Sequence, residues 1–191
     1  MRPDQRNRRP FTYALLFAIV ATAIHGTDSA AQDTATTPDK AREGIKLYRL
    51  DDDGLALQGY SPVSYFDKKT AEKGNPEFAV THQGITYHLT DTAQVEKFNA
   101  DPDKYEPAHG GWCSLAMCGK AGNRVSANPE SFKIVDDKLL LFFHGQYQGR
   151  IVDGLDNWNK SRSKEEVRVR RADSNWKKIT SGKKRSKVMN F

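Results

Sequence analysis

Two stretches of the chain each place a pair of strand-like segments on either side of a two-residue turn, and the first pair alternates apolar and polar residues; this pattern most constrains the fold. The segments and their turns are residues 78–82 and 85–89 across Gln83-Gly84, and residues 132–135 and 138–143 across Asp136-Asp137. Period-two alternation around a short polar or glycine-containing turn is typical of a β-hairpin. Because successive side chains of a strand point to opposite faces, Ile85, Tyr87 and Leu89 are expected to share one face. The chain is therefore predicted to contain two antiparallel hairpins.

Short helices are expected between and after these hairpins. Pro62 suits the first turn of a helix that ends near Phe66, and Asp91 lies in a run that can cap a second helix extending to about Asn99. From Gly149 onward the apolar pattern is helical. These elements predict an α+β fold: a small single domain with two β-hairpins, short helices between them and a helical C-terminal cover.

The first 31 residues have the order of a signal peptide. Four arginines precede an apolar run of fourteen residues at positions 11–24, and Ser29-Ala30-Ala31 offers small residues for cleavage. The run is shorter than the ~20 residues that span a bilayer, and we expect no transmembrane segment in the mature chain. The protein is therefore predicted to be exported, either periplasmic or secreted, with an uncleaved anchor as the alternative.

Composition and charge divide the rest of the chain. We predict a flexible leader at residues 32–54, a domain at 55–158, a C-terminal helical cover at 159–180 and a basic disordered tail at 181–191. Residues 160–191 contain twelve Lys and Arg against three Asp and Glu, whereas residues 32–159 have a net charge of −5. An acidic body argues against a nucleic-acid partner, although the basic tail could meet an acidic surface. No protein partner is indicated.

Most of the side chains that could bind a metal ion or act as a nucleophile lie between positions 109 and 119. Cys113 and Cys118, the two cysteines of the chain, occur here with Met117, and His109 precedes them. His88, on the first predicted hairpin, is a further donor. Thiolates, thioethers and imidazoles are soft or borderline metal ligands. We therefore predict that these five residues form a soft transition-metal site, with copper as the first choice of cofactor and zinc as the second.

Two other interpretations of the cysteines stay open. In an oxidising compartment Cys113 and Cys118 can form a disulfide, which would make the domain a non-catalytic structural or interaction module. A thiol-dependent enzyme would instead use Cys113 as its nucleophile and His109 or His88 as its base. The spacing differs from the Cys-x-x-Cys redox pattern, and no third residue that orients the base can be named. The sequence therefore favours a binding role over catalysis.

Six short motifs follow one another between residues 55 and 179. They are Gly59-Tyr60-Ser61-Pro62-Val63-Ser64-Tyr65-Phe66, Gly84-x-x-Tyr87, Phe98-x-x-x-Pro102-x-x-Tyr105, Gly110-Gly111-Trp112-Cys113-x-x-Ala116-Met117, Phe132-x-Ile134-x-Asp136 and Asn175-Trp176. In this order they resemble the YHS domain family, in its exported, free-standing bacterial branch, and the resemblance implies a small α+β fold. Other members of the family have two metal-binding cysteines where this chain has Thr90 and Gln94. A metal site here would therefore have to be centred on Cys113 instead.

Overall fold

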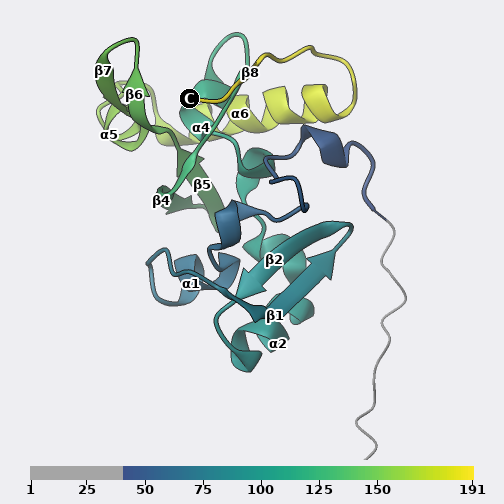
Figure 1. Ribbon diagram of the computed structural model, residues 1–191. Helices are drawn as coiled ribbons and strands as arrows, with labels where there is room; N and C mark the ends of the chain where they lie inside the picture. Colours follow the sequence, from purple (N-terminus) through teal and green to yellow (C-terminus); the bar gives the residue numbers. More distant parts are fainter. Residues whose placement is uncertain (1–40) are drawn as a thin grey trace, which may run out of the picture. The chain divides into compact units, whose positions relative to one another are not determined.

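The computed structural model describes residues 41–191, in which short helices and two-stranded sheets alternate along the chain (Figure 1). The helices are α1 (Pro62–Asp67), α2 (Thr92–Ala100), α3 (Pro102–Tyr105), α4 (Ser114–Cys118), α5 (Gly154–Asn159) and α6 (Glu165–Thr180). The strands are β1 (Asn75–His82), β2 (Ile85–Leu89), β3 (Arg124–Val125), β4 (Asn128–Val135), β5 (Lys138–Phe142), β6 (His144–Tyr147), β7 (Arg150–Asp153) and β8 (Val188–Met189). Short 3-10 segments are η1 (Ile45–Leu47), η2 (Leu57–Gly59) and η3 (Ala108–Gly111). The predicted α+β class is confirmed.

Both predicted hairpins form. β1 and β2 pair antiparallel next to the Gln83-Gly84 turn, and Ile85, Tyr87 and Leu89 are all buried on one face of β2. The second hairpin joins β4 to β5 across Asp136 and Asp137. Both turn residues have positive φ angles of 48° and 55°, a conformation that aspartate tolerates better than most residues.

Strand β5 runs through the centre of the core. Its residues from Leu139 to Phe142 are all buried, so both faces of the strand are covered. The loop that contains the cysteines runs along an edge of β5, because Cys113 forms a parallel bridge with Leu141. Trp158 of α5 packs against Phe142, with ring centroids 5.3 Å apart. The loop of greatest chemical interest therefore lies directly beside the most buried strand.

A third hairpin was not expected from the sequence. β6 and β7 pair antiparallel around Gln148 and Gly149, where the pattern from Gly149 onward was interpreted as helical. The apolar residues of this segment are few, and Ile151 is exposed, so no alternating apolar pattern marks these strands in the sequence. The helical pattern begins only at Gly154, where Asp153 caps α5 by accepting a hydrogen bond from the backbone of Asp156.

The C-terminal helical cover is present as α6, which packs on α4. The Asn175 amide donates hydrogen bonds to the backbone oxygens of Met117, at 2.8 Å, and Gly119, at 3.0 Å. These bonds satisfy carbonyls at the end of α4 that have no partner within so short a helix. Helix α6 therefore helps to fix the position of the cysteine-containing loop.

The ends of the described chain are more ordered than the sequence indicated. Residues 41–54, assigned to the flexible leader, pack on the domain: Arg42 forms a two-pronged ion pair with Glu106, and Leu47 accepts a hydrogen bond from the Trp112 indole. The basic tail is also ordered, because β8 pairs in parallel with β3. The predicted signal peptide and the first residues of the leader lie outside the described residues. Between residues 41 and 191, no helix has the length and hydropathy needed to cross a membrane.

Candidate functional site

Three consecutive residues with left-handed backbone shape the loop before α4. His109, Gly110 and Gly111 have φ angles of 57°, 63° and 82°, a region that glycine adopts without strain. A Cβ atom at Gly110 would lie 2.7 Å from the ring of Trp176, so the closeness of α6 also requires glycine. This turn buries His109 against α6 and leaves Cys113 as the residue that precedes α4.

The buried imidazole of His109 uses both of its nitrogens. Nδ1 lies 3.0 Å from Ser114 Oγ, and Nε2 lies 3.0 Å from Asp173 Oδ1. An ionised carboxylate only accepts hydrogen bonds, so Nε2 must donate to Asp173. In the neutral ring Nδ1 then accepts from the Ser114 hydroxyl. His109 consequently has no free lone pair to offer to a metal ion in this arrangement.

The carboxylate of Asp173 is held in its charged form. The hydrogen bond from His109, followed by that from Lys138 Nζ at 2.6 Å, lowers the pKa of Asp173 against the opposing effect of burial. Serine, histidine and aspartate in contact suggest an acyl-transfer triad. However, Ser114 is fully buried, so its hydroxyl cannot reach a substrate. The geometry therefore fits a positioning network for the loop.

The sulfur atoms lie in apolar surroundings. Cys113, Met117 and Cys118 are all buried. Burial raises the pKa of the Cys113 thiol, although hydrogen bonds from the backbone of Ala116, Phe143 and Leu115 partly oppose the rise. Burial also raises the pKa of the Cys118 thiol. Both thiols are therefore protonated near neutral pH, which weakens them as nucleophiles.

The structure does not contain the disulfide considered for these cysteines, because both are free thiols. Helix α4 separates them: Cys113 precedes its first residue and Cys118 is its last. Five residues of α-helix rise about 7.5 Å, which already exceeds the ~7 Å Cα separation that a disulfide tolerates. The Cys118 thiol instead donates to the Leu115 carbonyl oxygen at 3.2 Å. A Cys113–Cys118 bridge would require α4 to unwind.

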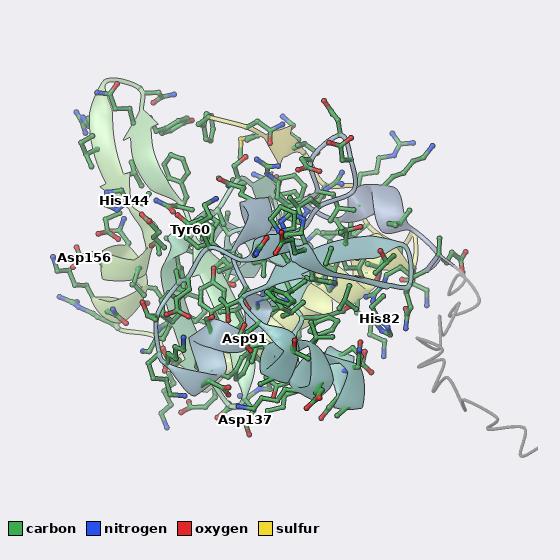
Figure 2. All side chains as sticks on the ribbon, turned by 60° about the horizontal axis from the view of Figure 1, so that its bottom comes forward. Tyr60, His82, Asp91, Asp137, His144 and Asp156 are labelled. Carbon is green, nitrogen blue, oxygen red and sulfur yellow. The ribbon has the colours of Figure 1, made fainter. Side chains whose placement is uncertain are left out.

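The five predicted ligands do not gather at one point. His88 lies on β2, where its ring is close to Gly59 and its backbone to Gly74. Two histidines outside the predicted set, His82 and His144, lie on opposite sides of the described part of the chain (Figure 2). Within residues 41–191, no three His, Cys, Asp or Glu side chains form a group that could hold a metal ion. The soft-metal site remains a prediction, without an assembled ligand set in the part of the chain that is described.

A cleft opens on the His109 side of the loop; we call it the His109 cleft. It has a volume of about 390 Å³, and Tyr48 and Trp176 contribute aromatic rings that pack edge to face with centroids 5.3 Å apart. His109 and Asp173 form part of its lining. The other charged lining residues are Lys104, Lys138, Lys177, Asp103, Glu106 and Asp137.

An apolar pocket of about 220 Å³ lies on the other side of the loop; we call it the Cys113 pocket. Cys113, Phe143 and Val152 are among the residues that line it, and the aromatic rings of Tyr147 and Phe191 also contribute. The imidazole and the Cys113 thiol therefore belong to two different hollows. Sequence proximity had suggested that they share one.

The sequence interpretation missed the partners that α6 supplies. Asp173 and Trp176 are three residues apart on this helix and both line the His109 cleft. That i, i+3 spacing places them on one face of a helix, but nothing in the sequence links this face to His109, which is 64 positions before Asp173. The Asn175-Trp176 motif was the only available signal.

Comparisons of the chain with protein-family models, with curated proteins and with solved structures found no match. The resemblance to the YHS domain family accordingly stays an expectation.

Proposed function

We propose that this protein is a binding module that holds a small, neutral, polyhydroxylated molecule, such as a saccharide unit, in the His109 cleft. The observation that carries the proposal is the His109–Asp173 hydrogen bond at 3.0 Å, which fixes polar groups in the same lining as the rings of Tyr48 and Trp176. Concave sites that combine aromatic surface with a few oriented polar groups are the usual form of small-molecule sites.

Several charges of the cleft are already neutralised within the protein. Glu106 accepts two hydrogen bonds from Arg42, one of them at 2.8 Å, and the side chains of both are largely buried. Asp173 is shared between His109 and Lys138. These groups have their charge compensated before any ligand arrives. They therefore disfavour a ligand that brings an additional charge to the inner part of the cleft.

The charges that remain are balanced. Lys104 and Lys177 form no ion pair with residues 41–191, and neither do Asp103 and Asp137. Two ammonium groups and two carboxylates around an aromatic wall provide donors and acceptors without net charge. Hydroxyl groups can both donate and accept, and the C–H face of a sugar ring can pack on an aromatic surface. This combination supports a neutral polyol over an anion, a cation or a hydrocarbon.

The test measures the binding of a panel of neutral saccharides to the full chain by saturation-transfer NMR. Asp137→Asn removes one free carboxylate at a position with φ 55°, which asparagine also adopts readily. The change should weaken binding about tenfold, as expected when a hydrogen bond to a charged group is lost. Asp156→Asn, which alters an exposed carboxylate on α5, is the matched control and should leave binding unchanged.

Three outcomes would count against the cleft as a saccharide site. One is the absence of binding to every neutral saccharide, and another is equal binding by Asp137→Asn and the parent chain. The third is tighter binding of a charged analogue than of its neutral counterpart. Thermal unfolding of each variant establishes that any difference is not due to loss of the fold.

A soft metal at Cys113 is the second candidate function. It is supported by the opening of the Cys113 pocket onto this residue. Elemental analysis of protein purified without chelator would show near-stoichiometric copper or zinc. That metal should be lost in Cys113→Ser, and retention of the metal in this variant would rule out Cys113 as a ligand.

A further inference from the structure

The large hydrophobic side chains that are exposed within residues 41–191 come from two segments that meet where Tyr147 contacts Phe191. They are Tyr147, Ile151, Val188 and Phe191, with exposed fractions from 39% to 66%. Two come from the β6–β7 hairpin and two from the last residues of the chain, and Figure 1 shows these segments next to one another. The Tyr147 and Phe191 rings are in contact, with centroids 4.7 Å apart. We call this set the apolar end.

The apolar end is held in place by the body of the domain. The backbone N–H of Arg124 donates to Lys187 at 2.9 Å, and that of Ser126 donates to Met189 at 3.0 Å. The Ser126 hydroxyl also donates to Asn190 Oδ1 at 2.8 Å. These bonds fix β8 beside β3, so the exposed side chains at positions 188 and 191 are presented by ordered backbone. Exposed apolar surface of this kind indicates an interaction site.

The same two segments are strongly basic. Residues 145–152 and 181–191 contain five Lys and Arg and no Asp or Glu. Arg150, Lys183, Arg185 and Lys187 are exposed, and none forms an ion pair within the described chain. The nearest carboxylate in sequence is Asp153, at the base of the hairpin, where Oδ2 lies 3.5 Å from His144 Nδ1. Both segments that carry the exposed apolar side chains therefore have a net positive charge.

The Cys113 pocket adds hydrocarbon surface at this end. Tyr147 and Phe191 belong both to the apolar end and to the lining of this pocket. Behind them, Phe143, Val152 and Met189 continue the apolar lining inward. A hydrocarbon group that approaches the apolar end would thus meet a preformed apolar hollow.

We infer that the apolar end docks on a bilayer that contains anionic phospholipid. Apolar side chains that enter the headgroup boundary, surrounded by Lys and Arg that contact anionic headgroups, are the features of surface-bound membrane proteins. Long cationic side chains can keep their charge at the headgroups while their stems lie on apolar surface. A polyanion such as nucleic acid would complement the cations but leave the aliphatic side chains of Ile151 and Val188 in water. The inference is independent of the His109 cleft, which lies on the other side of the loop.

The experiment compares binding of the full chain to vesicles of phosphatidylglycerol and phosphatidylcholine with binding to phosphatidylcholine alone. Arg185→Glu with Lys187→Glu should weaken binding to the anionic vesicles by at least about thirtyfold, the loss expected from removing two cations near an anionic surface. Lys46→Glu with Lys69→Glu makes the same change of charge at exposed positions elsewhere and should bind within about threefold of the parent chain. All proteins have the same first 40 residues, so the differences report on the apolar end alone.

Two further measurements separate lipid docking from other interactions. Ile151→Ser with Phe191→Ser keeps every charge and should weaken vesicle binding about tenfold or more, while binding of a soluble polyanion such as heparin should not change. Hydrogen exchange of residues 145–152 and 186–191 should slow when anionic vesicles are added. Unchanged exchange in both segments would overturn the inference, as would equal vesicle binding by the parent chain and the Arg185/Lys187 variant. Dependence of heparin binding alone on these charges would assign the surface to a polyanion.

Discussion

His109 Nε2 lies 3.0 Å from Asp173 Oδ1, joining the loop before α4 to the helix that covers it. The two residues are 64 positions apart, and this contact is one of the few polar links between the loop and α6. Together with the Ser114 hydroxyl on the opposite ring nitrogen, it fixes both the tautomer and the orientation of the imidazole. The polar wall of the His109 cleft therefore depends on a preorganised network.

Asp173→Asn should change how stability depends on pH. The pKa of Asp173 is lowered in the folded protein by His109 and Lys138, so its charge stabilises the fold above about pH 4, the unfolded value. This contribution is lost as the pH falls through the folded-state pKa. The Asp173 side chain is 37% exposed, and solvent screening limits the effect to about 1 kcal/mol.

The measurement is the free energy of unfolding in urea between pH 7 and pH 2. Asp173→Asn keeps an acceptor for His109 Nε2 but removes the negative charge. The variant should therefore be less stable than the parent chain at pH 7, and the two stabilities should converge at the lowest pH. Asp156→Asn, at an exposed ion pair, should follow the parent curve throughout. Parallel curves for Asp173→Asn and the parent chain would show that this carboxylate is not specifically stabilised.

Gly110→Ala should disrupt the loop more than alanine at another left-handed glycine. Gly110 and Gly149 have φ angles of 63° and 74°, so both substitutions introduce similar backbone strain of about 1–2 kcal/mol. At Gly149 nothing lies within 4 Å of an added Cβ, whereas at Gly110 the Trp176 ring would be 2.7 Å away. Displacing that ring should cost about 1–3 kcal/mol more.

Urea unfolding of the two alanine variants measures this difference directly. Gly110→Ala should also lose ligand binding in the His109 cleft, because Trp176 forms part of its wall. Gly149→Ala should retain that binding. Equal destabilisation by the two substitutions would mean that Trp176 can move away from the loop without cost.

The elements with a clear apolar period could be predicted from the sequence. β2 alternates buried and half-buried residues, and the run from Leu139 to Phe142 is long enough to fill a strand covered on both faces. The β6–β7 hairpin could not be predicted in this way, because its side chains are mostly exposed and no core face imposes alternation. Its Gln148-Gly149 turn is the only local signal.

The candidate site was predicted only in part, for a geometric reason. Sequence proximity of His109 and Cys113 suggested a shared site, but the left-handed turn at 109–111 directs them into different hollows. The partners of His109 are Ser114, within the same loop, and Asp173, on a helix distant in the sequence. A contact that depends on how α6 packs leaves no pattern in one sequence. The order of the C-terminal tail could not be predicted either. Backbone hydrogen bonds to β3 stabilise β8, and such bonds leave no side-chain pattern in the sequence.

Glu106→Gln should loosen residues 41–50 while leaving the rest of the domain folded. Glu106 holds Arg42 through two hydrogen bonds, and the Arg42 backbone N–H also donates to Gln83 at 3.0 Å. Loss of the negative charge leaves a largely buried guanidinium without its counter-ion, which should cost about 2–3 kcal/mol locally. Hydrogen exchange at residues 42–48 should accelerate, and exchange in β5 should not. Glu77→Gln, on an exposed part of β1, is the control and should leave both segments unchanged.

The two thiols should react slowly, and in a defined order. Burial raises the pKa of both, so little thiolate is present at pH 7.5, and Cys118 is the more accessible, at 7% exposed against 2% for Cys113. Alkylation in the folded state should therefore modify Cys118 first and Cys113 only after unfolding in urea, as followed by mass spectrometry.

Because the unfolded thiols ionise near pH 8.5, the fold should also lose stability as the pH rises above that value. Cys113→Ala, which leaves a single thiol, confirms the assignment of each rate. Rapid modification of Cys113 at neutral pH in the folded protein would instead favour a reactive thiolate and revive the thiol-dependent alternative.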